Sequence, residues 1–352
     1  MKTVSRTRDA SIDILRGIAT VLVVIGHIPY TPTALRAWIY TFHVPLFFVC
    51  SGILFSIERY PKFKDLFFAR VKGLLLPILS LGILARLLQV LISWIIGTAS
   101  GAGADYRIAL EPGKLLLSLL LGYRVHDYYY SFWFLYALFL GEILFYFAVK
   151  LFRKRWYCYL LMILCGIALQ YWISTFACGF IWSVDLLPAG LAFLAAGHLY
   201  RILLYEKERK LPAWLFPVML AVNILFTCLN YKNGEQVNLF YDYIGNPAFY
   251  LIAAAAGCLM CILFADLIRK SRLLEFFGRN SLVTYGFQNT VFIPLMMELL
   301  RFAGYGSSLF EDNTLKWILT VTGTLLLSAL LSGAINRFAP FLLGKRRKGK
   351  NA

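Results

Sequence analysis

The chain has few charged residues for its length. Asp, Glu, Lys and Arg make up 15% of its 352 residues, whereas a soluble domain typically has about 25%. Hydrophobic residues account for 60% of the chain, and its mean hydropathy is +0.70. So little charge cannot cover a soluble core of this size, and the composition therefore excludes an ordinary globular domain and predicts a membrane protein.

Acidic residues are scarcer than basic ones. The chain has 18 Asp and Glu against 35 Lys and Arg, which gives a formal net charge of +17. Such an excess is typical of nucleic-acid-binding proteins, but here the basic residues lie in short loops between apolar runs and not on a soluble face. We therefore predict no nucleic-acid partner and attribute the charge to membrane topology.

The sequence also lacks the Cys and His spacings that are typical of metal sites and disulfide frameworks. Nearly all seven cysteines fall inside apolar runs, and the Cys258–Cys261 spacing has no second Cys or His pair beside it. We predict neither disulfides nor a bound metal. The N-terminus starts basic and becomes apolar, yet it contains Arg16 and lacks a small-residue cleavage site, so we predict an uncleaved transmembrane helix and not a signal peptide.

Apolar runs long enough to cross a bilayer recur along the whole chain. They lie at 11–30, 37–57, 73–97, 128–149, 156–174, 180–200, 213–230, 247–267, 280–301 and 314–341. Most of the Lys and Arg residues fall at the two ends and in the loops after even-numbered runs, which places both termini in the cytoplasm. We predict an all-α polytopic membrane protein with about ten transmembrane helices and one membrane-embedded domain, 1–352.

The first run carries Arg16 and His27, eleven residues apart. In a helix this spacing is a rotation of about 1100°, so both side chains project within about 20° of each other and about 16 Å apart along the axis. Arg16 would then lie near the cytoplasm and His27 farther out. The second run brings His43 to a similar depth, and two imidazoles at one depth indicate acid–base chemistry near neutral pH.

Other ionisable residues inside the runs are functional candidates because burying them in a membrane is costly. They are Asp13, Arg86, Glu142, Asp185 and Glu298. Asp13 lies one turn from Arg16, so a local ion pair is an alternative to a functional role. Arg86 lies deep in its run, where it either binds a ligand or neutralises Glu142.

A carboxylate that orients His27 is expected from another helix. Asp185 and Glu298 lie at a suitable depth, although we favour an ion pair between Glu298 and the nearby Arg301. A Ser-His-acid triad within 13–52 is excluded, because Ser51 lies about 12 Å along the helix from His43.

These features fit a long donor with a charged head. The basic segment 58–72 and Arg16 would receive phosphate groups, while a thin arm runs along the first helix to His27. Coenzyme A thioesters have this shape, and a base at His27 would activate the hydroxyl of an acceptor from outside.

The sequence resembles the integral-membrane acyltransferase-3 family over essentially its full length, in particular the branch of sugar O-acetyltransferases related to fucose 4-O-acetylase. Arg16 and His27 match the family's pattern of a basic residue, ten further residues and then a histidine. Further matches are 42–48 (FHVPLFF), Ser51 with Gly52, Arg70 and Lys72 before Leu76-Pro77, 133–135 (WFL) and 278–282 (GRNSL) with Tyr285.

The chain departs from the family pattern at two places. The family often has an Arg-x-x-Arg pair, but the residue three after Arg70 is Gly73, which leaves Lys72 as the nearest substitute. A frequent histidine is replaced by Gln288, which cannot act as an acid or base.

The resemblance implies a bacterial plasma-membrane enzyme that transfers an acyl group, usually acetyl from cytoplasmic acetyl-CoA, to a hydroxyl of a cell-surface glycan or its lipid-linked precursor. His27 would be the catalytic base, Arg16 would position the donor, and His43 would assist. Arg70 and Lys72 would contact the donor head, with Ser51 in a supporting role. Direct transfer and a covalent acyl-histidine intermediate both stay open.

Two alternatives belong to other classes of protein. A transporter or flippase of a glycan precursor would also have many spans and buried charges, but transporters usually show repeated halves, and none is evident here. A structural subunit of a polysaccharide assembly machine would need no Arg16–His27 spacing. The outward tyrosines at 128–130, 241 and 243 suit sugar stacking, although we favour an interfacial aromatic belt.

Overall fold

The computed structural model of the chain describes residues 10–99, 112–122, 132–176, 179–231, 235–305 and 313–345. These ranges are mostly helical. The β-type pairing within them is limited to an isolated antiparallel bridge between Asn238 and Tyr243. Within them, eight helical segments are long and apolar enough to cross a membrane. The prediction of an all-α polytopic membrane protein is confirmed.

The long segments follow the predicted runs closely. They contain α1 (Ala10–His27), α2 (Thr33–Tyr40) with α3 (His43–Leu54), α4 (Phe63–Arg70) with η1 (Val71–Leu75) and α5 (Leu76–Ala99), α7 (Trp133–Phe152), α8 (Trp156–Ile173), η4 (Ile181–Leu186) with α9 (Leu187–Leu203), α11 (Pro247–Ile268) and α15 (Asn313–Phe338). Between the third and fourth predicted runs, the chain forms the short apolar helix α6 (Pro112–Leu121).

Two of the ten predicted spans are not among these eight long segments. The run 213–230 becomes α10 (Leu215–Asn230), which has 16 residues. The run 280–301 is divided into α13 (Ser281–Phe287), a π-helical turn η8 (Gln288–Phe292) and α14 (Ile293–Leu300). Pro294 explains the widened turn, because it has no N–H for the preceding turn of the helix and its ring crowds the carbonyl there.

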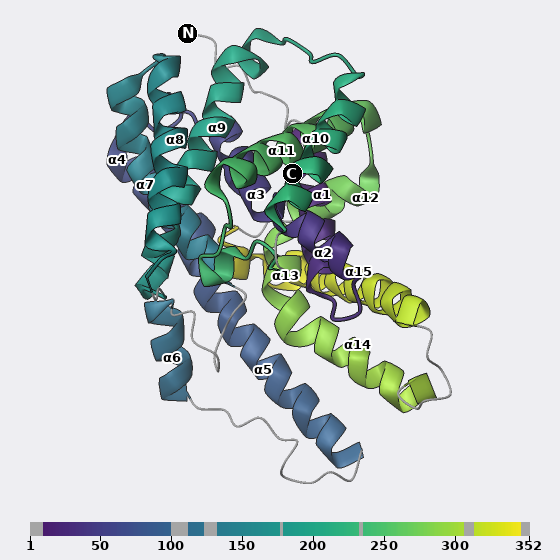
Figure 1. Cartoon of the computed structure of the whole chain (residues 1–352). Helices are drawn as coiled ribbons and strands as arrows, with labels where there is room; N and C mark the ends of the chain where they lie inside the picture. The colour runs from purple at the N-terminus through teal and green to yellow at the C-terminus, as the bar shows by residue number, and fades with distance from the viewer. Residues whose placement is uncertain are drawn as a thin grey trace.

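Helices α1 and α3 form the centre of the molecule. Helix α3 packs along α9, and α1 packs along α12 (Arg272–Arg279) and against α3 and α11. Figure 1 shows α5, α14 and α15 extending away from this central bundle. Helix α5 exposes Leu87, Leu91 and Trp94, which is the pattern expected of a surface that faces lipid.

The second predicted span is also interrupted, between α2 and α3. The break at Thr41 and Phe42 places Pro45 in the first turn of α3, where its missing N–H costs no hydrogen bond. Helix α1 ends at His27, two residues before Pro29, for a similar reason. Because of these two breaks, His27 is the last residue of α1 and His43 is the first residue of α3.

Candidate active site

Two cavities adjoin along α1 and share one residue, Tyr285. The His27 cavity has a volume of about 310 Å³ and the Arg16 cavity a volume of about 230 Å³. The side chains of Arg16 and His27, predicted to share a helix face, thus line neighbouring cavities. The ring of Tyr285 lies 5.2 Å from that of Phe134, which also lines the Arg16 cavity.

The two histidines are held in the same way. Nδ1 of His27 lies 2.8 Å from the carbonyl oxygen of Val23, and Nδ1 of His43 lies 2.9 Å from that of Ile39. A carbonyl oxygen can only accept a hydrogen bond, so each Nδ1 must carry the proton. Each Nε2 then has a free lone pair, which is the form of imidazole that acts as a base.

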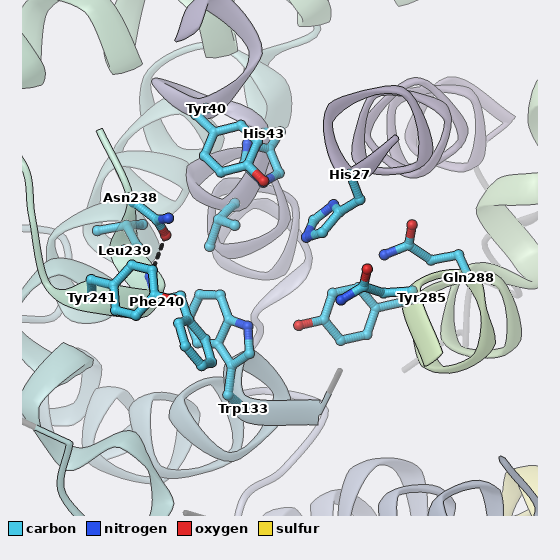
Figure 2. A pocket seen from close by; sticks show the side chains of 12 residues that line it. His27, Tyr40, His43, Trp133, Asn238, Leu239, Phe240, Tyr241, Tyr285 and Gln288 are labelled. Carbon is cyan, nitrogen blue, oxygen red and sulfur yellow. Dashed lines mark hydrogen bonds between the residues drawn. The ribbon is translucent and has the colours of Figure 1, made fainter. Parts of the chain in front are cut away.

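Aromatic side chains surround the histidines (Figure 2). The ring of Tyr40 lies 4.9 Å from the ring of His43 and 5.9 Å from that of His27. Across the cavity, the rings of Trp133 and Phe240 lie 6.0 Å apart. The cavity therefore presents flat apolar faces next to two potential bases.

The remaining wall comes from the widened turn η8. Gln288 and Asn289 both line the His27 cavity, and Figure 2 shows the Gln288 amide on the same side as Tyr285. Gln288 is 1% exposed, and its Oε1 has no hydrogen-bond partner among the described residues. This wall can hydrogen-bond a polar ligand without taking up a proton.

Arg36 fixes the turn that follows His27. Its Nη2 donates to the carbonyl oxygens of Ile28 and Pro29 at 2.9 and 2.8 Å. These carbonyls follow the C-terminus of α1, where backbone acceptors lack helical partners. In addition, Trp317 of α15 donates to the Thr31 hydroxyl at 2.9 Å. The end of α1 that carries His27 is therefore anchored from two directions.

The Arg16 cavity contains a buried ion pair between Arg70 and Glu142. The Glu142 side chain is 4% exposed, and Arg16 and Ser51 also lie beside its carboxylate. The sequence left open whether Arg86 neutralises Glu142, and the structure assigns that role to Arg70, with Arg16 nearby. The cavity thus combines cationic groups with one carboxylate.

Lys72 is not part of this cavity. Arg70, Gly73 and Leu74 line it, as expected for residues three and four apart on one helix face, whereas Lys72 is exposed. Lys72 lies two residues after Arg70 in the π-helical turn η1 and does not line the cavity, so it does not take the place of the second arginine of the Arg-x-x-Arg pattern there. Its predicted contact with the donor is therefore not supported by its position.

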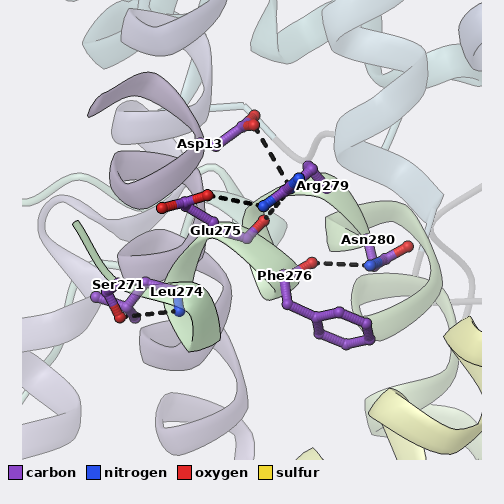
Figure 3. Close-up of polar contacts among 7 residues, drawn as sticks. All are labelled: Asp13, Ser271, Leu274, Glu275, Phe276, Arg279 and Asn280. Atoms are coloured by element: carbon purple, nitrogen blue, oxygen red, sulfur yellow. Dashed lines mark hydrogen bonds and ion pairs between the residues drawn. The ribbon is translucent and has the colours of Figure 1, made fainter. Parts of the chain in front are cut away.

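A third arginine reaches the Arg16 cavity from a distant part of the chain. Arg279 lines the cavity from the end of α12. Its Nε lies 3.7 Å from Asp13, and its Nη2 lies 2.8 Å from Glu275 (Figure 3). Asp13 thus forms an ion pair with Arg279, and the local Asp13–Arg16 pair considered from the sequence is not among the ion pairs of the described residues.

The other three predicted residues lie outside both cavities. Arg86 is buried and donates to Oε1 of Gln89 at 3.0 Å. Asp185 accepts hydrogen bonds from the backbone N–H groups of Gly179 and Phe180 at 2.9 and 3.2 Å. The carboxylate of Glu298 pairs with Arg301 at 2.8 Å, as favoured from the sequence.

Neither Asp185 nor Glu298 lines the His27 cavity, so the expectation that one of them orients His27 is not supported. The backbone carbonyl oxygen of Val23 accepts the hydrogen bond from Nδ1 of His27 instead.

Several lining residues were not identified as site residues from the sequence. They are Tyr40, Trp133, Asn238, Phe240, Tyr285, Asn289 and Arg279. Trp133, Arg279 and Tyr285 belong to segments that carry the family resemblance, which was the available signal. The predicted Tyr241 also lines the His27 cavity, whereas residues 128–130 lie outside the described part of the chain.

Comparison with known families supports an acyltransferase. The family model described as "Acyltransferase domain" matches residues 9–333, and this range contains every residue of both cavities. No curated protein and no solved structure matches the chain. The match gives no support to the transporter alternative. The protein is a membrane acyltransferase, and its chain belongs to the acyltransferase-3 family.

Proposed function

We propose that the protein transfers an acetyl group from cytoplasmic acetyl-CoA to a hydroxyl of a cell-surface glycan or its lipid-linked precursor, in a bacterial plasma membrane. The observation that carries this proposal is that Tyr285 lines both cavities. A donor that is anionic at one end and reactive at the other would occupy both. The acyl group would then meet the acceptor beside His27.

The charge of the Arg16 cavity suits the donor. Arg16, Arg70 and Arg279 bring three guanidinium groups to a cavity whose lining residues include one carboxylate, that of Glu142, while Asp13 and Glu275 pair with Arg279 beside it. One guanidinium group can donate two parallel hydrogen bonds to the oxygens of a phosphate, and it stays charged at any physiological pH. Arg279 is more exposed than Arg70, with 45% of its side chain accessible against 23%. We assign the phosphate groups of the donor to Arg279 and Arg70.

His27 acts as the general base in this proposal. Its Nε2 takes the proton from the acceptor hydroxyl while the hydroxyl oxygen attacks the thioester carbonyl carbon. The carbon–sulfur bond then breaks, and the leaving thiolate takes the proton from the imidazolium. The products are the acetyl ester and free coenzyme A, with His27 neutral again. His43, whose Nε2 has the same lone pair, assists by accepting a hydrogen bond from the acceptor.

The His27 cavity suits a sugar. Trp133, Phe240 and Tyr40 offer flat apolar faces for the C–H groups of a pyranose ring. Asn238, Gln288 and Asn289 offer amide groups for its hydroxyls. This combination of apolar and amide surface supports an acceptor from the sugar class, as in the O-acetyltransferase branch.

The test uses purified protein in detergent with radiolabelled acetyl-CoA and a panel of glycans. His27→Gln keeps a hydrogen-bond donor of similar size but removes the base, and we expect it to lose transfer and hydrolysis by about 100-fold or more. Elution as a single species shows that the variant is folded. Full activity of His27→Gln would refute the proposed role, and glycan movement across vesicles without acetylation would favour the transporter.

A further inference from the structure

A separate cavity lies where α3, α7 and α9 end, on the side predicted to be cytoplasmic. Its volume is about 500 Å³. The segment after α3, the end of α7 and the end of α9 contribute its lining, which is Phe55, Ser56, Ile57, Glu58, Val149, Lys150, Arg153, Lys154, His198, Arg201, Ile202 and Glu206. We refer to it as the α3–α7–α9 cavity.

Buried aromatic rings divide this cavity from the candidate active site. Helices α3 and α7 line the Arg16 cavity with Ser51 and Glu142, and one to two turns later they line the α3–α7–α9 cavity. Between these levels, the rings of Phe55 and Phe145 lie 5.1 Å apart, and that of His198 lies 5.6 Å from Phe145. Phe145 is fully buried. The α3–α7–α9 cavity is therefore a site of its own.

The acidic groups of the cavity are already engaged. Glu206 pairs with Nε of Arg201 at 2.8 Å, and Glu58 accepts a hydrogen bond from the Ser56 hydroxyl at 2.5 Å. Arg201 is 9% exposed, and its Nη1 also donates to the carbonyl oxygens of Ile53 and Phe55 at 3.2 and 2.8 Å. The carboxylates thus lie close to the buried arginine and the segment after α3.

The cations at the end of α7 are available to a ligand. Arg153 and Lys154 are exposed and form no ion pair within the part of the chain that the structure describes. Nζ of Lys150 lies 5.0 Å from the centre of the Tyr146 ring, so it is attracted to a π-face and not to a carboxylate. With Arg201, four cations line the cavity against two carboxylates.

Arg153 has a backbone conformation that non-glycine residues rarely adopt. Its φ is 54° and its ψ is −123°, and such a conformation persists only where the surroundings impose it. The hydroxyl of Tyr159, which is fully buried, donates to the Arg153 carbonyl oxygen at 2.7 Å. The ring of Tyr159 in turn lies 5.0 Å from that of His198. The turn that carries Arg153 and Lys154 is therefore fixed against the buried wall of the cavity.

Membrane topology alone accounts for basic residues on this side of the protein. It does not account for the gathering of three of them at the end of α7 on one cavity, for the buried Arg201 of α9 in its wall, or for a strained turn held by a buried tyrosine. A ligand with several acceptor oxygens and negative charge would bring these features together. Phosphate has this chemistry, because arginine and lysine donate to its oxygens from several directions.

We propose that the α3–α7–α9 cavity binds a phosphate group at the cytoplasmic face, with Arg153, Lys154 and Lys150 as its ligands and Arg201 as a buried charge behind them. The phosphate belongs either to the headgroup of an anionic phospholipid or to a soluble phosphate compound. Binding there is independent of the acyl donor, since the site lies outside both cavities of the candidate active site. The proposal therefore does not rest on the proposed function.

The test measures ligand binding by the thermal unfolding midpoint of the full chain in nanodiscs. One arm compares neutral phosphatidylcholine discs with discs that contain phosphatidylglycerol. The other arm adds inorganic pyrophosphate to neutral discs at constant ionic strength. A rise in the midpoint in the first arm assigns a lipid headgroup, and a rise in the second assigns a soluble phosphate.

We expect the double variant Arg153→Gln/Lys154→Gln to require a roughly thirtyfold higher concentration of the stabilising ligand for the same rise in midpoint. The reason is that each surface cation contributes about 1 kcal/mol to binding. The matched control is Lys270→Gln/Arg272→Gln, which removes the same charge between α11 and α12, away from this cavity. We expect less than a twofold change in the control.

Equal losses of ligand affinity in the two double variants would show that the ligand is attracted only to net positive charge, and would overturn the proposal. The absence of a midpoint shift in both arms would also overturn it. If the Arg153 change prevents folding, Lys154→Gln alone provides the test, with an expected loss of roughly fivefold.

Discussion

Nδ1 of His27 lies 2.8 Å from the carbonyl oxygen of Val23, one turn earlier in the same helix. In many enzymes a carboxylate holds the catalytic histidine in its basic tautomer. Here the last turn of α1 provides the acceptor from its own backbone. The tautomer and orientation of His27 therefore depend on where α1 ends and not on a residue from another helix.

This arrangement predicts that removing the nearest candidate carboxylates has little effect on catalysis. We expect Asp185→Asn and Glu298→Gln to retain acyl transfer within roughly twofold, because neither side chain reaches the His27 cavity. In Asp185→Asn, the amide oxygen of the new side chain can still accept from the N–H groups of Gly179 and Phe180, so the fold should also persist. A loss comparable to that of His27→Gln, measured with the same transfer assay, would show that a carboxylate does orient the base.

The buried pair of Arg70 and Glu142 predicts strongly coupled effects on stability. Arg70→Gln leaves the Glu142 carboxylate buried without its main partner, and such a loss costs about 3–5 kcal/mol, with Arg16 limiting it to the lower value. Glu142→Gln in the Arg70→Gln background should recover much of that loss. Unfolding in mixed detergent micelles measures the stability of Arg70→Gln, of Glu142→Gln and of the double variant. If the single effects add to within about 0.5 kcal/mol, the pair is not coupled.

Local sequence patterns predicted the parts of the site that depend on one helix. The Arg16–His27 spacing placed both side chains on one face of α1, and both line adjoining cavities. Pro29 and Pro45 lie inside the predicted runs 11–30 and 37–57, but the sequence did not show that a break would leave His43 at the start of α3. The second predicted span therefore appeared continuous although it is divided.

Contacts between distant segments could not be predicted in the same way. Asp13 pairs with Arg279 and not with Arg16, because α12 packs along α1. Nothing in either segment alone specifies that packing. Lys72 was taken as the nearest substitute for the second arginine because it is near Arg70 in sequence, yet it is exposed and does not line the cavity. In both cases, a residue near in sequence was considered as the partner, whereas the structure brings in a residue from a distant segment or leaves the nearby residue outside the cavity.

The segment after α3 predicts a pH-dependent contribution to stability. The hydrogen bond from Ser56, helped by the backbone N–H of Glu58 and the positive charge of Arg201, lowers the pKa of Glu58 below its ordinary value of 4.5. A lowered folded-state pKa stabilises the fold above that ordinary value, and the stabilisation is lost as the pH falls through the folded pKa.

We therefore expect the unfolding midpoint of the wild type to exceed that of Glu58→Gln at pH 7, and the difference to shrink as the pH falls below 4.5. His198 also faces this group, and it is present in both proteins, so comparing the two isolates the effect of Glu58. A difference that stays constant or grows on acidification would contradict the assignment.

The contact between α1 and α12 predicts that two glycines are required for assembly of the Arg16 cavity. A Cβ atom on Gly17 would overlap the carbonyl oxygen of Leu274, and one on Gly278 would overlap the carbonyl oxygen of Asp13. The obstacle is backbone in both cases and cannot rotate away. Gly17→Ala and Gly278→Ala should each destabilise the protein by about 1–3 kcal/mol or more and displace Arg279.

Gly333→Ala on α15 is the matched control, since no described atom beyond its own stretch of helix backbone lies within 4 Å of its added Cβ. Alanine favours a helix over glycine by about 1 kcal/mol, so this variant should unfold at the wild-type midpoint or above it. The unfolding midpoint and the KM for the proposed donor, acetyl-CoA, are measured for all three variants. Because α12 carries Arg279, the two α1–α12 variants should also raise KM, and wild-type values for both quantities would mean that the helices tolerate a wider separation.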